Sequence, residues 1–282
     1  MLSEFLRKGT VYLQNIFGRL ETGFELLIFL YFCVKITVET SLLNSMALIL
    51  HIETSAKNCS LALSQDGQLL FDKVDTAGSA HSVQLGLFVD EALKVAEAMG
   101  LKLDAVAVSS GPGSYTGLRI GVSMAKGICY ALNIPLISVP TLDLLADEVV
   151  RTKALSENAR ICPLVDARRM EVYTAVYDSK GVVLQSVSAI IVDETTFQAE
   201  LENHPICFVG DGAEKCRTII GSENAEFDGQ IVPLASSLLP LAEKRYREQQ
   251  FEDVAYFEPF YLKDFVATVS KKSLIPAAPL QK

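Results

Sequence analysis

The segment Gly111–Gly121, with the sequence GPGSYTGLRIG, has residue types and a spacing that suit contact with an anion. Glycines let a ligand approach the backbone closely, and the free N–H groups at a helix start favour an anion. The segment lacks the lysine of the Walker A loop and differs from the dinucleotide-binding motif. One interpretation is therefore a phosphate cradle in which Gly111, Gly113 and Ser114 bind the anion.

The same segment also has a structural interpretation. Gly117, Gly121 and Ala125 lie four residues apart, so on a helix they form one ridge of small residues. Such a ridge lets another helix approach closely. The residues alone leave the phosphate cradle and the packing ridge both open.

Glu53-Thr54-Ser55, at the end of an early apolar run, is the second candidate for chemistry. In actin-like ATPases an acid and hydroxyls after the first strand position magnesium and phosphates. A strand end capped by hydroxyl groups is the other interpretation, and both stay open.

Metal chemistry is not expected. His81 opens a predicted helix, and a metal site there would place a second histidine four residues later, on the same face. That position is Leu85, and the sequence contains no H-E-x-x-H motif. We therefore expect His81 to be a hydrogen-bonding residue at a helix start. No spacing supports a Ser-His-Asp or Cys-His arrangement, so no catalytic residue is assigned.

Two similar series of elements must position these residues. Alternating apolar patterns, turn residues and helix stops predict strands at 48–53, 58–64 and 68–74, then a helix at 82–99, a strand at 105–109, a helix at 115–132, a strand at 136–139 and a helix from Thr141, as its cap, to 151. The second series has strands at 160–165, 171–177 and 182–189, a helix at 193–202, a strand at 206–209, and helices after 212 and at 236–249. Asp66-Gly67 predicts a tight hairpin turn.

This repetition predicts a duplicated α/β fold of the actin-like (ASKHA, RNase H-like) type. We expect two β-β-β-α-β-α subdomains, at residues 46–152 and 153–282, the second ending in a short tail. Residues 1–45 differ in character, and we expect them to be an extension from a mis-assigned start, with translation beginning at Met46. Their apolar run, 26–34, is shorter than the roughly 20 residues that span a membrane.

The net charge and the cysteine content indicate which partners and which cellular compartment to expect. The net charge of −9 argues against a chain that binds nucleic acid by itself, because phosphates are normally met by a surplus of lysine and arginine. The six cysteines form no C-x-x-C pair, which favours buried free thiols in a reducing cytoplasm.

The helix at 82–99 is unusually apolar around its circumference. One stripe contains Leu85, Phe88, Val89, Ala92, Ala96 and Met99, and Val83, Leu87 and Val95 widen it. A helix on a sheet needs one stripe only, so the extra cover favours a partner interface. Deep burial within the same domain stays the alternative.

Several motifs occur together in this chain: Ile52–Ser55, His81-Ser82, Gly111–Gly121, Ala125–Gly127, Ser138–Leu142 and Pro259–Lys263. Between Met46 and about Lys272 they resemble the TsaB (YeaZ) family. The resemblance implies a non-catalytic subunit that pairs with TsaD, joined by the ATPase TsaE, to form N6-threonylcarbamoyladenosine at position 37 of ANN-decoding tRNAs. It also implies tRNA contact only through the complex, and a homodimer when the chain is alone.

The resemblance implies site residues as well. The first two helices build the subunit interface in this family, which assigns interface roles to His81, Leu85, Phe88, Val89, Ala92, Thr116, Ile120 and Met124. TsaD carries a His-x-x-x-His metal motif on its first helix, and Leu85 stands where its second histidine would be.

Glu53, Thr54 and Ser55, with Gly111, Gly113 and Ser114, then form a vestigial phosphate site. The chain itself needs no cofactor, and ATP or ADP is expected, if anywhere, at the subunit junction. An independent actin-like ATPase or small-molecule kinase is the alternative function, and a metallopeptidase is disfavoured by the missing ligand pair.

Overall fold

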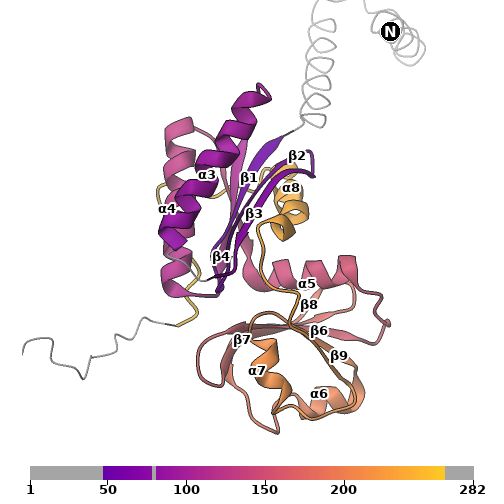
Figure 1. Ribbon diagram of the computed structural model, residues 1–282. Coiled ribbons are helices and arrows are strands. Elements are labelled where there is room, and N and C mark those ends of the chain that lie inside the picture. The colour runs from indigo at the N-terminus through magenta and orange to yellow at the C-terminus, as the bar shows by residue number, and fades with distance from the viewer. Residues whose placement is uncertain (1–46, 78–80, 264–282) are drawn as a thin grey trace, which may run out of the picture. The chain divides into compact units, whose positions relative to one another are not determined.

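The computed structural model describes residues 47–77 and 81–263 (Figure 1). The expectations for residues 1–45 and for the tail after residue 263 lie outside the described residues. No helix in the described part of the chain is both long and apolar enough to cross a membrane.

The first half begins with three strands that pair in antiparallel fashion, as predicted. Its elements are β1 (Leu48–Glu53), β2 (Cys59–Gln65), β3 (Gln68–Asp75), α3 (His81–Ala98), β4 (Ala105–Gly111), α4 (Tyr115–Leu132), β5 (Leu136–Pro140) and α5 (Thr141–Thr152). The sheet order is β3-β2-β1-β4-β5, and β4 and β5 run parallel to β1. At the predicted turn, Asp66 and Gly67 both have positive φ, 49° and 73°, as a type I′ hairpin requires.

The second half repeats this arrangement. Its elements are β6 (Arg160–Asp166), β7 (Glu171–Asp178), β8 (Val183–Ile191), α6 (Gln198–Asn203), β9 (Ile206–Val209), α7 (Ala213–Arg217), β10 (Ala225–Asp228), η1 (Ser236–Leu238) and α8 (Leu239–Arg247). The order β8-β7-β6-β9-β10 reproduces the first sheet strand for strand, with the same directions. The predicted duplicated actin-like α/β fold is confirmed.

Two local predictions were wrong, and one strand was missed. Thr141 does not cap α5, because the cap position is Pro140 and Thr141 lies inside the first turn. The helix predicted at 193–202 starts only at Gln198, since Asp193 instead accepts hydrogen bonds from Thr195 and Thr196 in a turn. Strand β10 was missed because its alternating sequence, AEFD, is only four residues long, at the lower limit of the pattern that predicts a strand.

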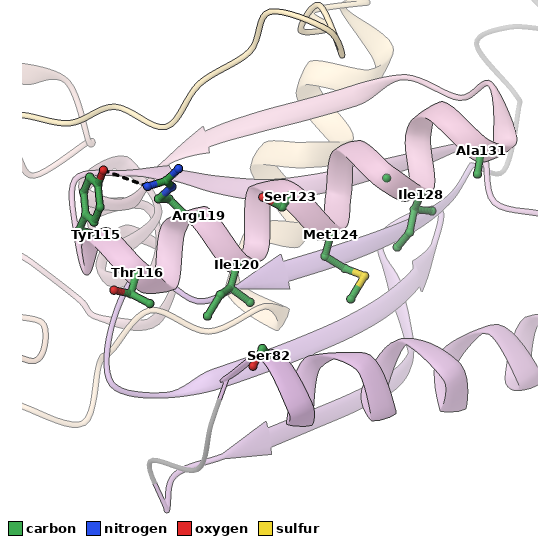
Figure 2. Close-up of a pocket in the computed structure, with 10 residues that line it drawn as sticks. Ser82, Tyr115, Thr116, Arg119, Ile120, Ser123, Met124, Ile128 and Ala131 are labelled. Carbon is green, nitrogen blue, oxygen red and sulfur yellow. Dashed lines mark hydrogen bonds between the residues drawn. The ribbon is translucent and has the colours of Figure 1, made fainter.

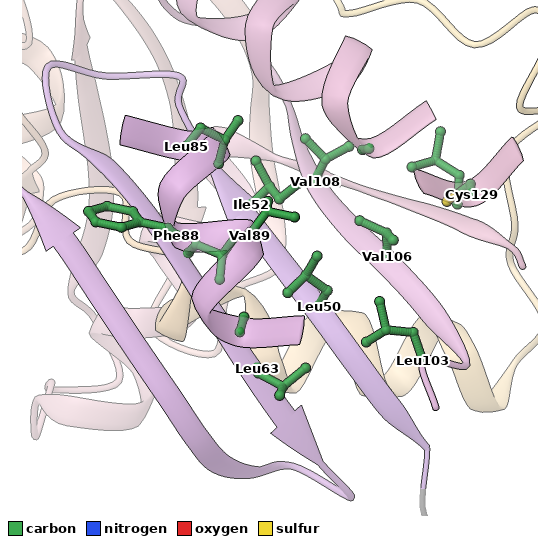
Figure 3. Packing of buried hydrophobic residues seen from close by; sticks show 14 of the residues in the cluster. Leu50, Ile52, Leu63, Leu85, Phe88, Val89, Leu103, Val106, Val108 and Cys129 are labelled. Carbon is green, nitrogen blue, oxygen red and sulfur yellow. The ribbon is translucent and has the colours of Figure 1, made fainter. Parts of the chain in front are cut away.

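The core of the first half lies between its sheet and helices α3 and α4, which cover one face (Figure 1). Leu85 and Val89 of α3 belong to the same buried cluster as Leu50, Ile52 and Leu63 of the strands (Figure 3). Strand β1 is also buried on its other face, which includes the Ile49 cluster with residues of α5 and α8. This two-sided burial explains why all six residues of β1 are inaccessible to solvent.

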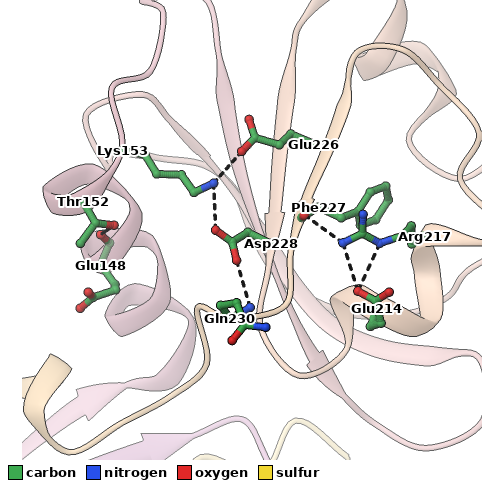
Figure 4. Close-up of polar contacts among 9 residues, drawn as sticks. All are labelled: Glu148, Thr152, Lys153, Glu214, Arg217, Glu226, Phe227, Asp228 and Gln230. Carbon is green, nitrogen blue, oxygen red and sulfur yellow. Dashed lines mark hydrogen bonds and ion pairs between the residues drawn. The ribbon is translucent and has the colours of Figure 1, made fainter.

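Helix α5 connects the two halves. Its residues Leu142, Leu145 and Val149 pack with buried residues of β6 and β7, and Asp143 accepts a hydrogen bond of 2.7 Å from the Tyr177 hydroxyl. Directly after the helix, the Lys153 ammonium pairs with Glu226 at 2.6 Å and with Asp228 at 3.0 Å, both in β10 (Figure 4). Helix α5 therefore supplies part of the core of the second half.

The glycines of α4 bring this helix against the end of β1. A Cβ atom on Gly117 would lie 2.0 Å from the Thr54 carbonyl oxygen, and one on Gly121 would lie 2.2 Å from Thr54 Oγ1. The Thr54 hydroxyl donates a hydrogen bond of 2.8 Å to the Gly117 carbonyl oxygen. The small-residue ridge that includes Ala125 thus packs on the end of β1 in its own domain, and the partner it admits so closely is a strand end and not another helix.

We predict that Gly117→Ala and Gly127→Ala, two substitutions on the same helix, have opposite effects on stability. The Gly117→Ala methyl group would clash with the Thr54 carbonyl oxygen, so this substitution should lower the free energy of unfolding by about 3 kcal/mol or more. A Cβ atom on Gly127 meets nothing within 4 Å, so the second should raise it by about 0.5–1 kcal/mol through helix propensity. Urea denaturation measures both, and equal effects would contradict this account of the ridge.

Candidate functional site

An open hollow of about 810 Å³ lies along the outer side of α4, next to the start of α3. It is lined by Ser82 of α3 and by Tyr115, Thr116, Arg119, Ile120, Ser123, Met124, Gly127, Ile128 and Ala131 of α4. Figure 2 shows Ile120, Met124 and Ile128 along the side of α4 that faces Ser82. On the helix these lining residues form two ridges with a four-residue spacing. One consists of the larger apolar residues Ile120, Met124 and Ile128, and the other of the small residues Ser123, Gly127 and Ala131.

Three of the residues assigned to an interface lie in this hollow. Thr116 is exposed, and Ile120 and Met124 are half-buried, with part of each side chain packed on the core below. Ile128, which continues their four-residue spacing, was missed. The signal was present in the sequence, because position 128 continues the spacing of Ile120 and Met124 and also carries an apolar side chain.

The interface residues assigned on α3 lie elsewhere. Leu85 and Ala92 have no exposed area, and Phe88 and Val89 are 9% and 8% exposed, because these side chains pack on the sheet of their own domain (Figure 3). Leu85 and Ala92 therefore offer no surface to a partner in this structure. The large apolar residues that α3 leaves exposed are Val83, Leu87 and Leu93.

His81 is half-buried at the first position of α3, where its Nε2 lies 3.3 Å from the Ala56 carbonyl oxygen. This contact agrees with a hydrogen-bonding role at the helix start. Within the described residues, no group of three or more histidine, cysteine, aspartate or glutamate side chains could hold a metal ion.

The glycine-rich loop uses its backbone groups inside the domain. The Ser114 N–H donates a hydrogen bond of 2.6 Å to the Ser55 carbonyl oxygen, and the Gly117 N–H donates to Ser114 Oγ at 3.3 Å. A Cβ atom on Gly113 would lie 2.4 Å from the same Ser55 oxygen. The predicted phosphate residues are brought together, but Gly113 and Ser114 are in contact with Ser55 itself.

A segment near the end of the described chain covers the loop from the other side. The Phe260 N–H donates a hydrogen bond of 2.7 Å to the Ser110 carbonyl oxygen, and the Tyr261 and Tyr115 rings are 4.9 Å apart. The first part of this segment is bound to α4, because the Lys126 ammonium donates hydrogen bonds to the Ala255 and Phe257 carbonyl oxygens, at 3.1 and 2.8 Å. We call residues 253–263 the covering segment. Its contact with the loop was missed, although Pro259–Lys263 was noted as a motif, because no local pattern shows that a distant loop is its neighbour.

The acid of the predicted phosphate site is buried. Glu53 has no exposed area, and its Oε1 accepts a hydrogen bond of 2.5 Å from the Ser55 N–H. Burial raises the pKa of the Glu53 carboxyl, and the nearby Asp211 charge raises it further, against hydrogen bonds from Ser55 and Ser109 that lower it. Burial likewise raises the pKa of Asp211. Carboxyl groups held toward their neutral form are poor ligands for magnesium.

The cysteines behave as predicted in the part of the chain that the structure describes. Cys59, Cys129, Cys162, Cys207 and Cys216 are buried free thiols. Burial raises the pKa of the Cys59 and Cys129 thiols to about 11, so neither is a ready nucleophile.

Comparisons with known proteins give the family. Residues 75–271 match the family model for TsaD, tRNA N6-adenosine threonylcarbamoyltransferase. The tRNA threonylcarbamoyladenosine biosynthesis protein TsaB of Escherichia coli K12 is 30% identical over 78% of this chain and 96% of its own length. The TsaB protein of Bacillus subtilis 168 is 32% identical over 57% of this chain and 70% of its own length.

A solved structure agrees with these sequence relatives. YeaZ from Pseudomonas aeruginosa superposes with a TM-score of 0.63 at 25% identity, covering 77% of this chain and all of that one. The family model spans more than half of the chain, and the TsaB relative from E. coli matches over almost its whole length. The chain therefore belongs to the TsaB (YeaZ) family.

Proposed function

We propose that this chain is a non-catalytic partner subunit of a TsaD-type enzyme, required for the formation of N6-threonylcarbamoyladenosine at position 37 of ANN-decoding tRNAs. The observation that carries the proposal is the hollow on α4, an open and largely apolar surface in a chain whose relatives are named for this biosynthesis. The described residues hold no cluster that could supply a catalytic metal.

The lining of the hollow suits the helix of a protein partner better than a small molecule. Its ridge of small residues, Ser123, Gly127 and Ala131, permits close approach of a second helix, while Ile120, Met124 and Ile128 supply apolar contact area beside it. The Arg119 guanidinium donates to the Tyr115 hydroxyl at 3.1 Å and forms a polar rim at one end. An apolar centre with a polar rim is the usual anatomy of a protein interface.

The finer parts of the proposal follow from the family. A TsaE-like ATPase joins the complex, tRNA is contacted only within it, and the same surface of α3 and α4 forms a homodimer when the chain is alone. The buried free thiols fit a protein that works in the reducing cytoplasm.

We also propose that any ATP or ADP sits at the subunit junction and not on this chain alone. The loop N–H groups of Ser114 and Gly117 are satisfied inside the domain, the covering segment lies over Ser110 and Gly111, and burial disfavours ionised Glu53. These contacts weigh against an independent ATPase or kinase.

The central prediction concerns Ile120→Asp. A carboxylate in the middle of the hollow would be buried without a partner on binding, so we expect the affinity for the TsaD-type subunit to fall about 100-fold or more. Ile191→Asp is the matched control, because Ile191 is 73% exposed on β8, outside the hollow. Co-elution in size-exclusion chromatography, followed by titration calorimetry, measures the loss.

Because Ile120 also touches the core, Gly127→Leu provides an independent variant. Its side chain would enter open space and fill the hollow while the helix stays intact. Pairing that survives both Ile120→Asp and Gly127→Leu would refute the hollow as the docking surface.

A second prediction separates the proposal from the ATPase alternative. Titration of the isolated chain with magnesium and ATP should give no saturable heat, whereas the complex with the TsaD-type subunit should bind nucleotide. Tight, magnesium-dependent binding with turnover by the isolated chain would establish the alternative instead.

A further inference from the structure

The turn between β6 and β7 carries two consecutive arginines in a backbone conformation that arginine rarely adopts. Arg168 has φ of 72° and Arg169 has φ of 52°, both in the left-handed region, and both side chains are exposed. Glycine would take this conformation without strain. Strained non-glycine residues are concentrated at functional sites, so the pair calls for an explanation through its side chains.

Hydrogen bonds from Lys215 and to Asp166 and Asp211 hold the turn in this shape. The Lys215 ammonium donates hydrogen bonds to the Arg169 carbonyl oxygen at 2.9 Å and to the Glu171 carbonyl oxygen at 2.6 Å. Asp166 Oδ1 accepts from the Arg168 N–H at 2.8 Å, and the Asp166 N–H in turn donates to Asp211 at 3.0 Å. A lysine at the centre of the turn thus fixes the backbone from which both arginines project.

The neighbouring acids are already paired with other cations. Asp166 forms an ion pair with Lys215, and Glu171 forms one with Lys263 of the covering segment. Within residues 47–77 and 81–263, neither the Arg168 nor the Arg169 guanidinium has a hydrogen-bond or ion-pair partner. Arg217, by contrast, pairs with Glu214 at 3.1 Å (Figure 4).

We propose that Arg168 and Arg169 bind phosphate groups of the tRNA backbone when the chain is in its complex. The inference rests on the proposed function, which brings tRNA to the complex, and it adds a contact site on this chain. Guanidinium groups match phosphate oxygens in bidentate geometry, and a backbone fixed beforehand reduces the entropy that binding costs. The site is local, so it is compatible with the overall charge of −9.

The surroundings of the pair favour RNA over a second protein. The next residue, Met170, is half-buried and packs into the core of the second half, so it adds little apolar area to the turn. The apolar hollow expected to receive a protein is on α4, a different element. Two free cations on a polar turn suit a phosphate backbone, which is recognised chiefly by charge.

The test uses the full chain in complex with the TsaD-type subunit and an unmodified ANN-decoding tRNA transcript. One double variant, Arg168→Gln with Arg169→Gln, removes the charges and keeps side-chain length; another, Arg168→Gly with Arg169→Gly, removes the strain as well. The matched control is Lys244→Gln with Arg245→Gln, a consecutive basic pair on the regular helix α8. Co-elution is measured first, then tRNA affinity at several salt concentrations.

We expect both arginine variants to pair normally with the catalytic subunit and to bind tRNA about 10-fold more weakly, with a salt dependence reduced by about two phosphate contacts. The control should behave like the unchanged chain. The glycine variant should also unfold at a higher temperature, because it relieves the left-handed strain.

Unchanged tRNA affinity and salt dependence in both arginine variants would overturn the proposal, as would the same loss of affinity in the control. Loss of pairing in both arginine variants would also overturn it, because the arginines would then serve the protein interface. If the unchanged chain itself fails to co-elute with the catalytic subunit, the proposed function fails and the tRNA assignment fails with it.

Discussion

The close contact between helix α4 and the end of strand β1 is the constraint on which the rest of the molecule depends. Gly117 and Gly121 have no room for a Cβ atom beside Thr54, so this face of the helix can point only inward. The adjoining side, with Ile120, Met124 and Ile128, is then left half-buried at the surface. One packing requirement inside the domain thereby determines which side of α4 is available to a partner.

The same contact gives the glycine-rich loop a structural role. Its residues resemble a phosphate cradle in type and in position after a buried strand, yet Gly113 and Ser114 lie directly against Ser55, and the covering segment contacts Ser110 and Gly111 from the other side. The loop now joins three separated parts of the chain. Burial also pushes Glu53 toward its neutral form, so the residues predicted to cradle phosphate serve as a structural junction in this fold.

Sequence reasoning reached the duplicated fold because its signals are local. Asp66-Gly67, the helix stops and the strand patterns each depend on a few neighbouring residues. It failed where the decisive neighbour is distant: spacing showed that Gly117, Gly121 and Ala125 share one side of a helix, but not that this side meets Thr54. Likewise the apolar stripe around Leu85 was recognised, whereas the burial of Leu85 itself depends on strands Leu48–Glu53 and Cys59–Gln65. The covering segment carries the motif Pro259–Lys263, but its contact with the glycine-rich loop has no local signature, since the two segments are far apart in the sequence.

A reconstituted modification reaction tests the central claim most directly. Purified TsaD-type subunit, a TsaE-type ATPase and an unmodified ANN-decoding tRNA are incubated with the reaction's substrates, with or without this chain. The tRNA is then digested to nucleosides and analysed by mass spectrometry. The account predicts N6-threonylcarbamoyladenosine only when the chain and the catalytic subunit are both present. Equal amounts of the modified nucleoside without the chain, or its formation by the chain without the catalytic subunit, would contradict the account.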